Sequence, residues 1–231
     1  MEVPEMKSQI SDSIPCGVLL AISGGCMDAY SYLFRDHVFA NAQTGNMLLF
    51  GVHLANADYS AALKYLFPVL AFTAGIILSD IINRKIKNIR IHWRQISVLV
   101  EVIMLGMVSF IPETNNALAN AMISFACGIQ LESFRKIRGN SIATTMCIGN
   151  LRSGTYNLDQ YVATREPSYL KKAFLYFGII ASFVIGAVLE SRLILHMGSH
   201  AILLSPALLI LVLLIMFHKA PSEAADINME Y

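Results

Sequence analysis

The sequence predicts an all-α fold: a polytopic membrane helix bundle with about six spanning helices, two re-entrant or broken segments and an internal duplication. Of the 231 residues, 55% are hydrophobic and only 14% are charged, and the mean hydropathy is +0.56. Several windows contain the ~20 predominantly apolar residues that a helix needs to cross ~30 Å of hydrocarbon. A soluble helical protein would show a polar face along such windows, and none is visible.

A stretch of 23 residues occurs twice, at residues 24–46 and 128–150, offset by 104 positions without a gap. The first copy reads GGCMDAYSYLFRDHVFANAQTGN and the second GIQLESFRKIRGNSIATTMCIGN. Asp28 falls on Glu132, and the pair Gly45-Asn46 falls on Gly149-Asn150. Identity is low, so the evidence is the coincidence of the acid, the turn and the Gly-Asn pair at one offset. This coincidence predicts an internal duplication.

Six apolar segments are expected to span the bilayer. They cover residues 16–34, 59–82, 95–111, 117–134, 170–193 and 201–217, with Pro68 as an expected kink in the second. The predicted organisation is a polar leader (1–14), a first membrane repeat (15–112), a second membrane repeat (113–218) and a polar tail (219–231). The acidic leader lacks a small-residue cleavage pattern, so no cleaved signal peptide is expected, and the tail is expected to be disordered.

Two further segments, residues 35–53 and 142–163, are half polar and carry the Gly-Asn pairs, so each either spans the membrane or enters and returns. Short cytoplasmic loops are enriched in Lys and Arg. If both segments span, ten basic residues lie inside and six outside. If both re-enter, thirteen lie inside and only Arg35, Lys64 and Arg192 outside, with Arg152 within the second segment in either scheme. The count favours re-entry, and the spanning scheme stays open.

Re-entry would place both termini in the cytoplasm and set the two halves of the chain in opposite orientations. Gly45 and Gly149 would then approach each other from opposite faces, as in transporters with inverted repeats, where broken helices meet near the midplane. Irregular backbone at that depth is tolerated only against protein or a water-filled cavity. The spanning scheme would instead give eight helices and a parallel repeat.

Several motifs carry a family resemblance. They are G-x-x-D-A at residues 25–29, A-N-x-x-T-G-N at residues 40–46, and G-x-Q at residues 128–130 followed by G-N at residues 149–150. Together they resemble the YoaK-type family of bacterial polytopic membrane proteins of unknown function, over about residues 15–217. The resemblance implies an inner-membrane protein with about six helices and no established substrate. Ile148 departs from the family pattern, which more often has Thr before the Gly, and this would weaken or specialise the second half of a site.

Asp28 is the first candidate for a binding site. A carboxylate within a membrane span costs roughly 2.5 to 3.5 kcal/mol on insertion scales, so it should face a cavity or a partner. The alternative is a hydrated position near the interface, seven residues before Arg35. Glu132, three residues before Arg135, has the spacing of an ion pair at a helix end. Glu101 and Glu190 are either partners or interfacial, and the sequence does not choose between these.

The two Gly-Asn pairs supply the other candidates. Gly lets the chain leave helical geometry and expose backbone groups, while Thr and Asn supply neutral ligands. The same residues also pack helices and cap broken ends. The hypothesis is a central site for a small solute or ion, formed by Asp28, Asn41, Thr44, Gly45, Asn46, Gln130, Glu132, Gly149, Asn150 and Arg152. Arg152 would bind an anion or neutralise Glu132.

Other classes of function have little support. The net charge of +1 gives no reason to expect nucleic-acid binding. The four cysteines and six histidines lack metal-ligand spacing, and no P-loop, nucleophile elbow or dinucleotide fingerprint is present, so no metal, cofactor or enzymatic activity is expected. The favoured hypothesis is a transporter or channel coupled to protonation of Asp28, with the lipid bilayer and a small solute or ion as partners. The alternative is a structural or regulatory membrane protein without transport, and homo-oligomerisation stays open.

Overall fold

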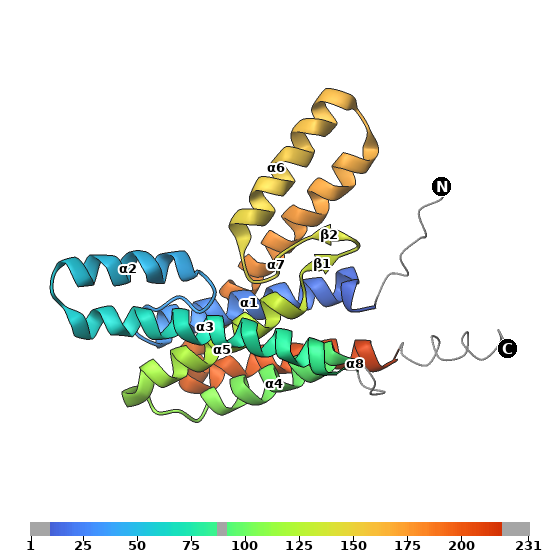
Figure 1. Cartoon of the computed structure of the whole chain (residues 1–231). Helices are drawn as coiled ribbons and strands as arrows, with labels where there is room; N and C mark the ends of the chain where they lie inside the picture. Colours follow the sequence, from blue (N-terminus) through green and yellow to red (C-terminus); the bar gives the residue numbers. More distant parts are fainter. Residues whose placement is uncertain (1–9, 87–91, 219–231) are drawn as a thin grey trace.

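The structure is a computed structural model that describes residues 10–86 and 92–218 (Figure 1). Its α-helices are α1 (Ile14–Phe34), α2 (Gln43–Ala55), α3 (Tyr59–Lys85), α4 (Trp93–Val108), α5 (Asn116–Ser133), α6 (Cys147–Thr164), α7 (Pro167–Met197) and α8 (Leu204–His218). Short 3-10 helices cover Ile10–Asp12, Glu113–Asn115 and Gly198–Leu203. The only strands within the described residues are β1 (Lys136–Ile137) and β2 (Asn140–Ser141), which form a small antiparallel hairpin. The predicted all-α fold is confirmed.

Every apolar segment predicted from the sequence is helical, with ends that differ by a few residues. Pro68 lies within the continuous helix α3. Within the described residues, three helical stretches are long and apolar enough to cross a membrane: Ile14–Phe34, Tyr59–Lys85 and Pro167–Phe217, the last of which covers α7 and nearly all of α8. Most of the leader, the middle of the basic linker (residues 87–91) and the predicted disordered tail lie outside the described residues.

Helix α1 lies at the centre of the bundle, and the helices around it run in opposing directions (Figure 1). It is antiparallel to α5, because Arg35 just after α1 bonds to Asn116 at the start of α5, while Gln130 near the end of α5 bonds to Leu20. Helix α1 packs mainly on α7 and also on α8, while α5 packs mainly on α3 and also on α4. Helices α4 and α8 complete the bundle by packing on each other.

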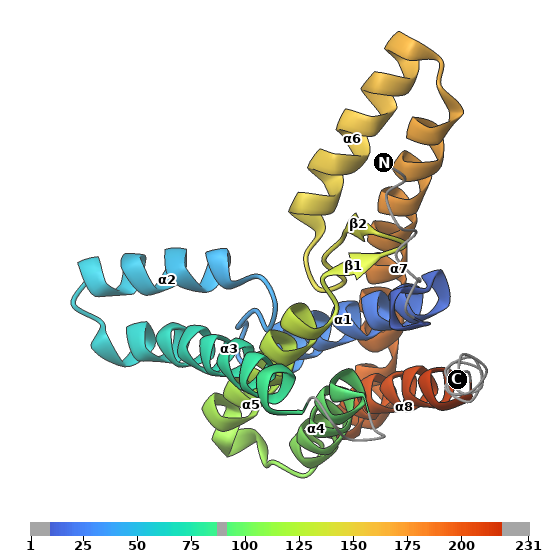
Figure 2. The same ribbon diagram turned by 45° about the vertical axis from the view of Figure 1, so that its right-hand side comes forward.

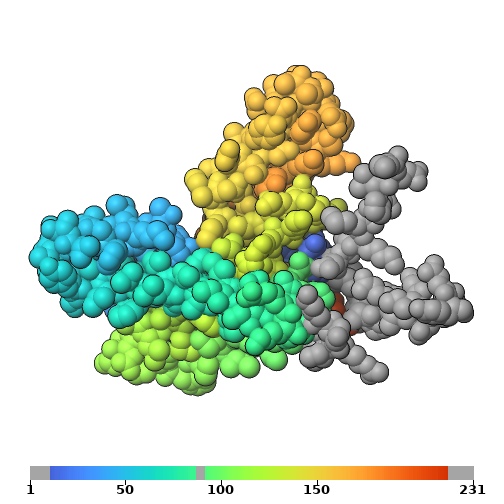
Figure 3. Space-filling model, in the orientation of Figure 1, coloured from blue at the N-terminus to red at the C-terminus, as the bar shows by residue number. Residues whose placement is uncertain are grey.

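Two hairpins extend from this bundle. Helix α2 packs along the first part of α3, and α6 packs along the first part of α7. Figure 2 shows that the two hairpins leave the bundle in different directions, and Figure 3 shows the recess that separates their outer ends. A non-helical polar segment precedes each hairpin, one before α2 and one before α6.

The crossing of α1 and α7 depends on glycine. Gly25 of α1 lies against the backbone carbonyl of Phe183, and Gly186 of α7 lies against the carbonyl of Ile22. A Cβ atom at either glycine would overlap the facing backbone. Small residues let the two helix backbones approach closely. In a membrane the hydrophobic effect does not drive helices together, so the van der Waals contacts of such close packing stabilise their association.

The crossing of α3 and α5 repeats this arrangement. Gly75 of α3 lies against the carbonyl of Phe125, and Gly128 of α5 lies against the carbonyl of Phe72. In both crossings each glycine faces the carbonyl three residues before the glycine of the other helix. The pair α1 and α7 and the pair α5 and α3 are thus held together in the same way.

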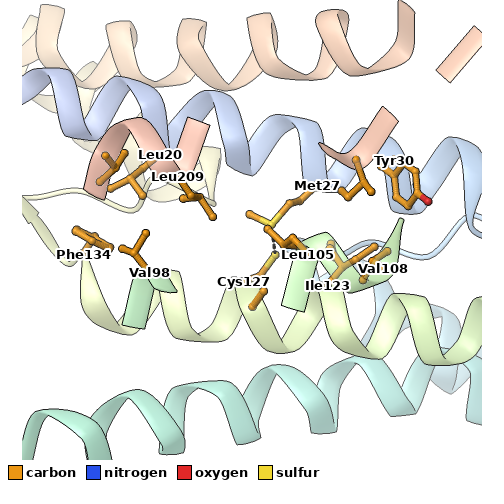
Figure 4. Close-up of a cluster of buried hydrophobic side chains, with 14 of the residues drawn as sticks. Leu20, Met27, Tyr30, Val98, Leu105, Val108, Ile123, Cys127, Phe134 and Leu209 are labelled. Atoms are coloured by element: carbon orange, nitrogen blue, oxygen red, sulfur yellow. Dashed lines mark hydrogen bonds between the residues drawn. The ribbon is translucent and has the colours of Figure 1, made fainter. Parts of the chain in front are cut away.

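The apolar core lies between α1, α4, α5 and α8 (Figure 4). Its largest buried members include Leu20, Met27, Leu105, Ile123, Phe134 and Leu209. Figure 4 shows Met27 of α1 and Cys127 of α5 pointing toward each other, with the two sulfur atoms 3.6 Å apart. This core holds α1 in place along the length that borders the candidate site.

Arg35 is completely buried at the end of the bundle where α1 ends. Its guanidinium forms no ion pair within the described residues and bonds only to neutral oxygens. These are the Tyr30 hydroxyl (2.9 Å from Nη2 and 3.1 Å from Nε), the carbonyls of Ile111 (2.8 Å), Val108 (3.3 Å) and Pro112 (3.3 Å), and Asn116 Oδ1 (3.0 Å). The Tyr30 hydroxyl donates to the carbonyl of Ser199, 3.0 Å away. Arg35 therefore belongs to the core and not to a loop, which removes it from the count of loop charges.

We expect Gly186→Val to lower the Tm of the purified protein because its branched side chain would push α7 away from α1, at a cost of about 1 to 3 kcal/mol for overpacking. Gly178→Val on the same helix is the control, since nothing lies within 4 Å of a Cβ at that position. Thermal unfolding of both variants in detergent measures the difference. An equal effect of the two substitutions would contradict the packing role of Gly186.

Replacing Arg35 by Met should destabilise the fold by roughly 3 kcal/mol or more, because several buried carbonyls would lose their donor. The exposed Arg192 provides the matched control, and Arg192→Met should leave stability within about 0.5 kcal/mol of the parent. The measurement is the Tm in detergent. A tolerated Arg35→Met would show that the guanidinium does not hold this end of the bundle together.

Candidate functional site

The first connector (residues 35–42) leaves the end of α1 and runs back along it. The backbone N–H of Asn41 donates to Asp28 Oδ1 at 2.8 Å, and the backbone N–H of Ala40 donates to Ser31 Oγ at 3.1 Å. Asn41 Nδ2 donates to the carbonyl of Gly24 at 2.8 Å. The carboxylate thus lies at the N-terminal end of α2, where free N–H groups and the helix dipole stabilise a negative charge.

Asn46 closes the first connector. Its Oδ1 accepts from the backbone N–H of Phe39 at 3.1 Å, and its Nδ2 donates to the carbonyl of Phe39 at 2.7 Å. Asn46 Nδ2 also donates to Gln43 Oε1 at 2.9 Å, and Gln43 Nε2 donates to the carbonyl of Ala40 at 2.7 Å. The side chains therefore replace the helical hydrogen bonds that the connector lacks.

Asn150 closes the second connector (residues 134–146) with the same pair of bonds. Its Oδ1 accepts from the backbone N–H of Ala143 at 3.3 Å, and its Nδ2 donates to the carbonyl of Ala143 at 2.6 Å. A further bond joins Nδ2 to the carbonyl of Met146 at 3.1 Å. In both connectors the Asn side chain bonds to the backbone of the residue seven positions earlier. The two Asn residues are themselves 104 positions apart, which is the offset found in the sequence.

The two connectors meet on one face of α1. Leu20, Gly24 and Asp28 share that face because they are four residues apart. The second connector reaches Gly24, where the carbonyl of Thr144 lies 3.0 Å from the position that a Cβ would occupy. Gln130 Nε2 donates to the carbonyl of Leu20 and to Thr144 Oγ1, both at 3.0 Å. Gly24 is therefore the position on α1 that both halves of the chain contact.

The two glycines of the Gly-Asn pairs do not break the helices. Gly45 lies in the first turn of α2 and Gly149 in the first turn of α6, and neither has a positive φ. The irregular backbone lies before them, in the connectors. The expectation that these glycines expose backbone groups is therefore wrong, because the Asn bonds complete the connectors and let each helix begin before its glycine.

The remaining predicted site residues lie away from this meeting point. Thr44 and Arg152 are exposed. Glu132 forms an ion pair with Arg135, as its spacing predicts for a helix end. Ile148 is 78% exposed, so its side chain lines no buried site in this structure. The candidate site thus keeps Asp28, Asn41 and Gln130 as its buried or partly buried members, with Asn46 and Asn150 as supports.

Sequence reasoning missed the role of Thr144 and Thr145, which are both about 1% exposed and lie at Gly24. The offset of 104 could have found Thr145, because it aligns with Asn41. The structure also places Glu101 and Glu190 fully inside the bundle, where both are 0% exposed. The Glu101 carboxylate has no hydrogen-bond partner within the described residues, and Glu190 lies beside the Cys26 thiol.

No group of three or more His, Cys, Asp or Glu side chains comes together anywhere in the described part of the chain, so that part shows no cluster typical of a transition-metal centre. The polar groups at Gly24 are amides, hydroxyls and carbonyls beside a single carboxylate. Such a set is suited to a small polar solute or an ion with oxygen ligands.

Comparisons with known proteins place the chain among membrane proteins. The profile of the family described as "Protein of unknown function (DUF1275)" matches residues 16–215. The UPF0700 transmembrane protein YoaK of Bacillus subtilis (strain 168) is 22% identical over 183 residues, which cover 74% of this chain and 79% of that protein. No solved structure matches the chain. Because the profile covers most of the sequence, the chain belongs to the DUF1275 family and is a multi-pass membrane protein of the YoaK type.

Proposed function

We propose that this protein transports a small solute or ion through a central site at Gly24 of α1. The observation that carries the proposal is the meeting of the two connectors on the face of α1 that bears Asp28. Polar, non-helical backbone is costly inside a bilayer and is tolerated only where it is buried in protein or lines a cavity. Two such segments at one point favour a site over packing alone. The proposal involves no catalysis.

We also propose an inverted internal repeat, which would support this function. Residues 15–112 and 113–218 would form the two repeats, with α1 to α4 corresponding to α5 to α8. The antiparallel course of α1 and α5, the two matching glycine crossings and the two Asn closures all fit such a relation. Six spanning helices (α1, α3, α4, α5, α7 and α8) would then enclose two re-entrant units, each a connector followed by α2 or α6. Transporters with inverted repeats place their site where such units meet.

The orientation that we propose puts both termini in the cytoplasm of a bacterial cell, with the protein in the inner membrane. With Arg35 buried, re-entry of both units leaves only Lys64 and Arg192 outside, against thirteen basic residues inside. Helix α3 runs parallel to α5, because Ser79 near the end of α3 lies 2.9 Å from Ser133 at the end of α5. Helix α5 begins beside Arg35, so α3 also begins at the end of the bundle where α1 ends. In the proposed topology each unit would return to the side that it entered.

Cysteine accessibility tests this topology. Single cysteines at Asp58 and Glu166, both exposed at the outer ends of the two hairpins, should react with a membrane-impermeant maleimide from opposite sides of intact cells and inverted vesicles. The four native cysteines would first be replaced by Ser or Ala. Labelling of both positions from the outside would support the spanning scheme and refute re-entry.

Transport itself is tested with purified protein in proteoliposomes on a solid-supported membrane, challenged with panels of small organic solutes and salts. A substrate-dependent current is expected, and Asp28→Asn should reduce it at least tenfold. The amide oxygen can still accept from the Asn41 N–H, so the fold should survive. Asp80→Asn removes an exposed carboxylate paired with Arg84 and serves as the control. Absence of any flux with folded protein, or equal flux in Asp28→Asn, would favour a structural role instead.

A further inference from the structure

Among the buried oxygen atoms without a hydrogen-bond partner in the described residues, three belong to side chains that lie against the Leu20–Gly24 turn of α1 from outside that helix. They are Asn41 Oδ1, Gln130 Oε1 and Thr145 Oγ1. Their side chains are 0%, 0% and 1% exposed. Buried polar atoms are nearly always paired, so three unpaired oxygens in one region call for a ligand that they can bind.

The local hydrogen bonds hold these oxygens in place. Asn41 uses Nδ2 to bind the carbonyl of Gly24, and Gln130 uses Nε2 to bind the carbonyl of Leu20 and the hydroxyl of Thr144. Because both NH₂ groups are already hydrogen-bonded, the oxygen atom of each amide remains as an acceptor that no donor in the described residues reaches. The two carbonyls that they bind are one helical turn apart on α1, which brings the amides to the same stretch of that helix.

Thr145 of the second connector supplies the third unpaired oxygen. Its Cα lies 3.3 Å from the position that a Cβ on Gly24 would occupy, so the residue is in contact with the same turn of α1. Asn41 also binds Asp28 through its backbone N–H, which puts one carboxylate beside the amide. The region therefore combines neutral oxygens from both halves of the chain with a single negative charge.

We propose that these oxygens bind a monovalent alkali cation, Na⁺ or K⁺, at Gly24. Neutral amide, hydroxyl and carbonyl oxygens replace the hydration shell of such ions in membrane proteins. A Ca²⁺ site would normally draw on several carboxylates, and Mg²⁺ would keep part of its water shell, whereas one carboxylate matches one positive charge. The cation supplies the partner that the three oxygens lack and links the two connectors across α1.

This cation site deepens the proposed function. The role of the cation as the transported or coupling ion rests on that proposed function. Asn41 and Thr145 occupy equivalent positions of the two copies, at an offset of 104. An ion bound by both would hold the two re-entrant units against each other. Its release would free one unit from the other.

The experiment measures the Tm of purified protein in detergent as NaCl or KCl replaces N-methyl-D-glucamine chloride at constant ionic strength. We expect one alkali cation to raise Tm by about 5 °C at roughly 100 times its Kd, because a ligand that binds only the folded state stabilises it. CaCl₂ and MgCl₂ should give no comparable rise. No cation effect in the parent protein, or stabilisation by a divalent ion instead, would overturn the proposal.

Thr145→Val provides the sharpest variant. It removes an unpaired hydroxyl while keeping the shape of the side chain, so the ion-free protein should fold as well as the parent. The cation concentration needed to raise Tm by a given amount should increase at least tenfold. Ser124→Ala is the matched control, since Ser124 carries another buried, unpaired hydroxyl on α5. An unchanged cation response in Thr145→Val, or an equal loss in Ser124→Ala, would place the ion elsewhere.

The two proposals fail separately. Solute currents that depend on Asp28, in a protein that no alkali cation stabilises, would sustain transport and refute the cation site. A cation-dependent Tm that Thr145→Val abolishes, in a protein without any flux, would sustain the cation site and refute transport.

Discussion

The structure depends on one constraint: inside a bilayer, every backbone N–H and carbonyl must find its partner within the protein. The connectors before α2 and α6 are the places where helical bonding stops, and side chains satisfy their backbone. Asn46 and Asn150 bind the residues seven positions earlier, and the Asp28 carboxylate accepts the N–H of Asn41, just before α2. Arg35 does the same at the turn between α4 and α5, where it donates to three carbonyls. Four side chains thus satisfy backbone groups of the irregular segments.

Close helix packing then brings these segments together. Glycines at the two crossings let α7 approach α1 and let α3 approach α5 until backbone meets backbone. Gly24, the residue before the crossing glycine Gly25, leaves room on α1 for the second connector. The same helix therefore uses neighbouring glycines for two purposes, helix packing on one side and contact with polar segments on the other. Larger side chains at these positions would separate the halves of the site.

Local patterns predicted much of this structure, and long-range contacts could not be predicted. Apolar segments predicted the helices, and the spacing of Glu132 and Arg135 predicted an ion pair, because both depend on neighbours in the sequence. The offset of 104 identified Asn46 and Asn150 as equivalent, although it did not say that their side chains close the connectors. The sequence places Arg35 among the loop charges, because most of its partners lie 73 to 85 residues away, on α4, on α5 and in the turn between them. The burial of Glu101 and Glu190 likewise depends on which helices surround them.

The position of α1 has a mechanical consequence. Both connectors contact the same turn of one helix, the first through the bond from Asn41 to Gly24 and the second through Thr144 and Thr145. At the end of that helix, Arg35 joins α1 to the turn between α4 and α5. A displacement of α1 at Gly24 would therefore change the contacts of both halves of the chain together.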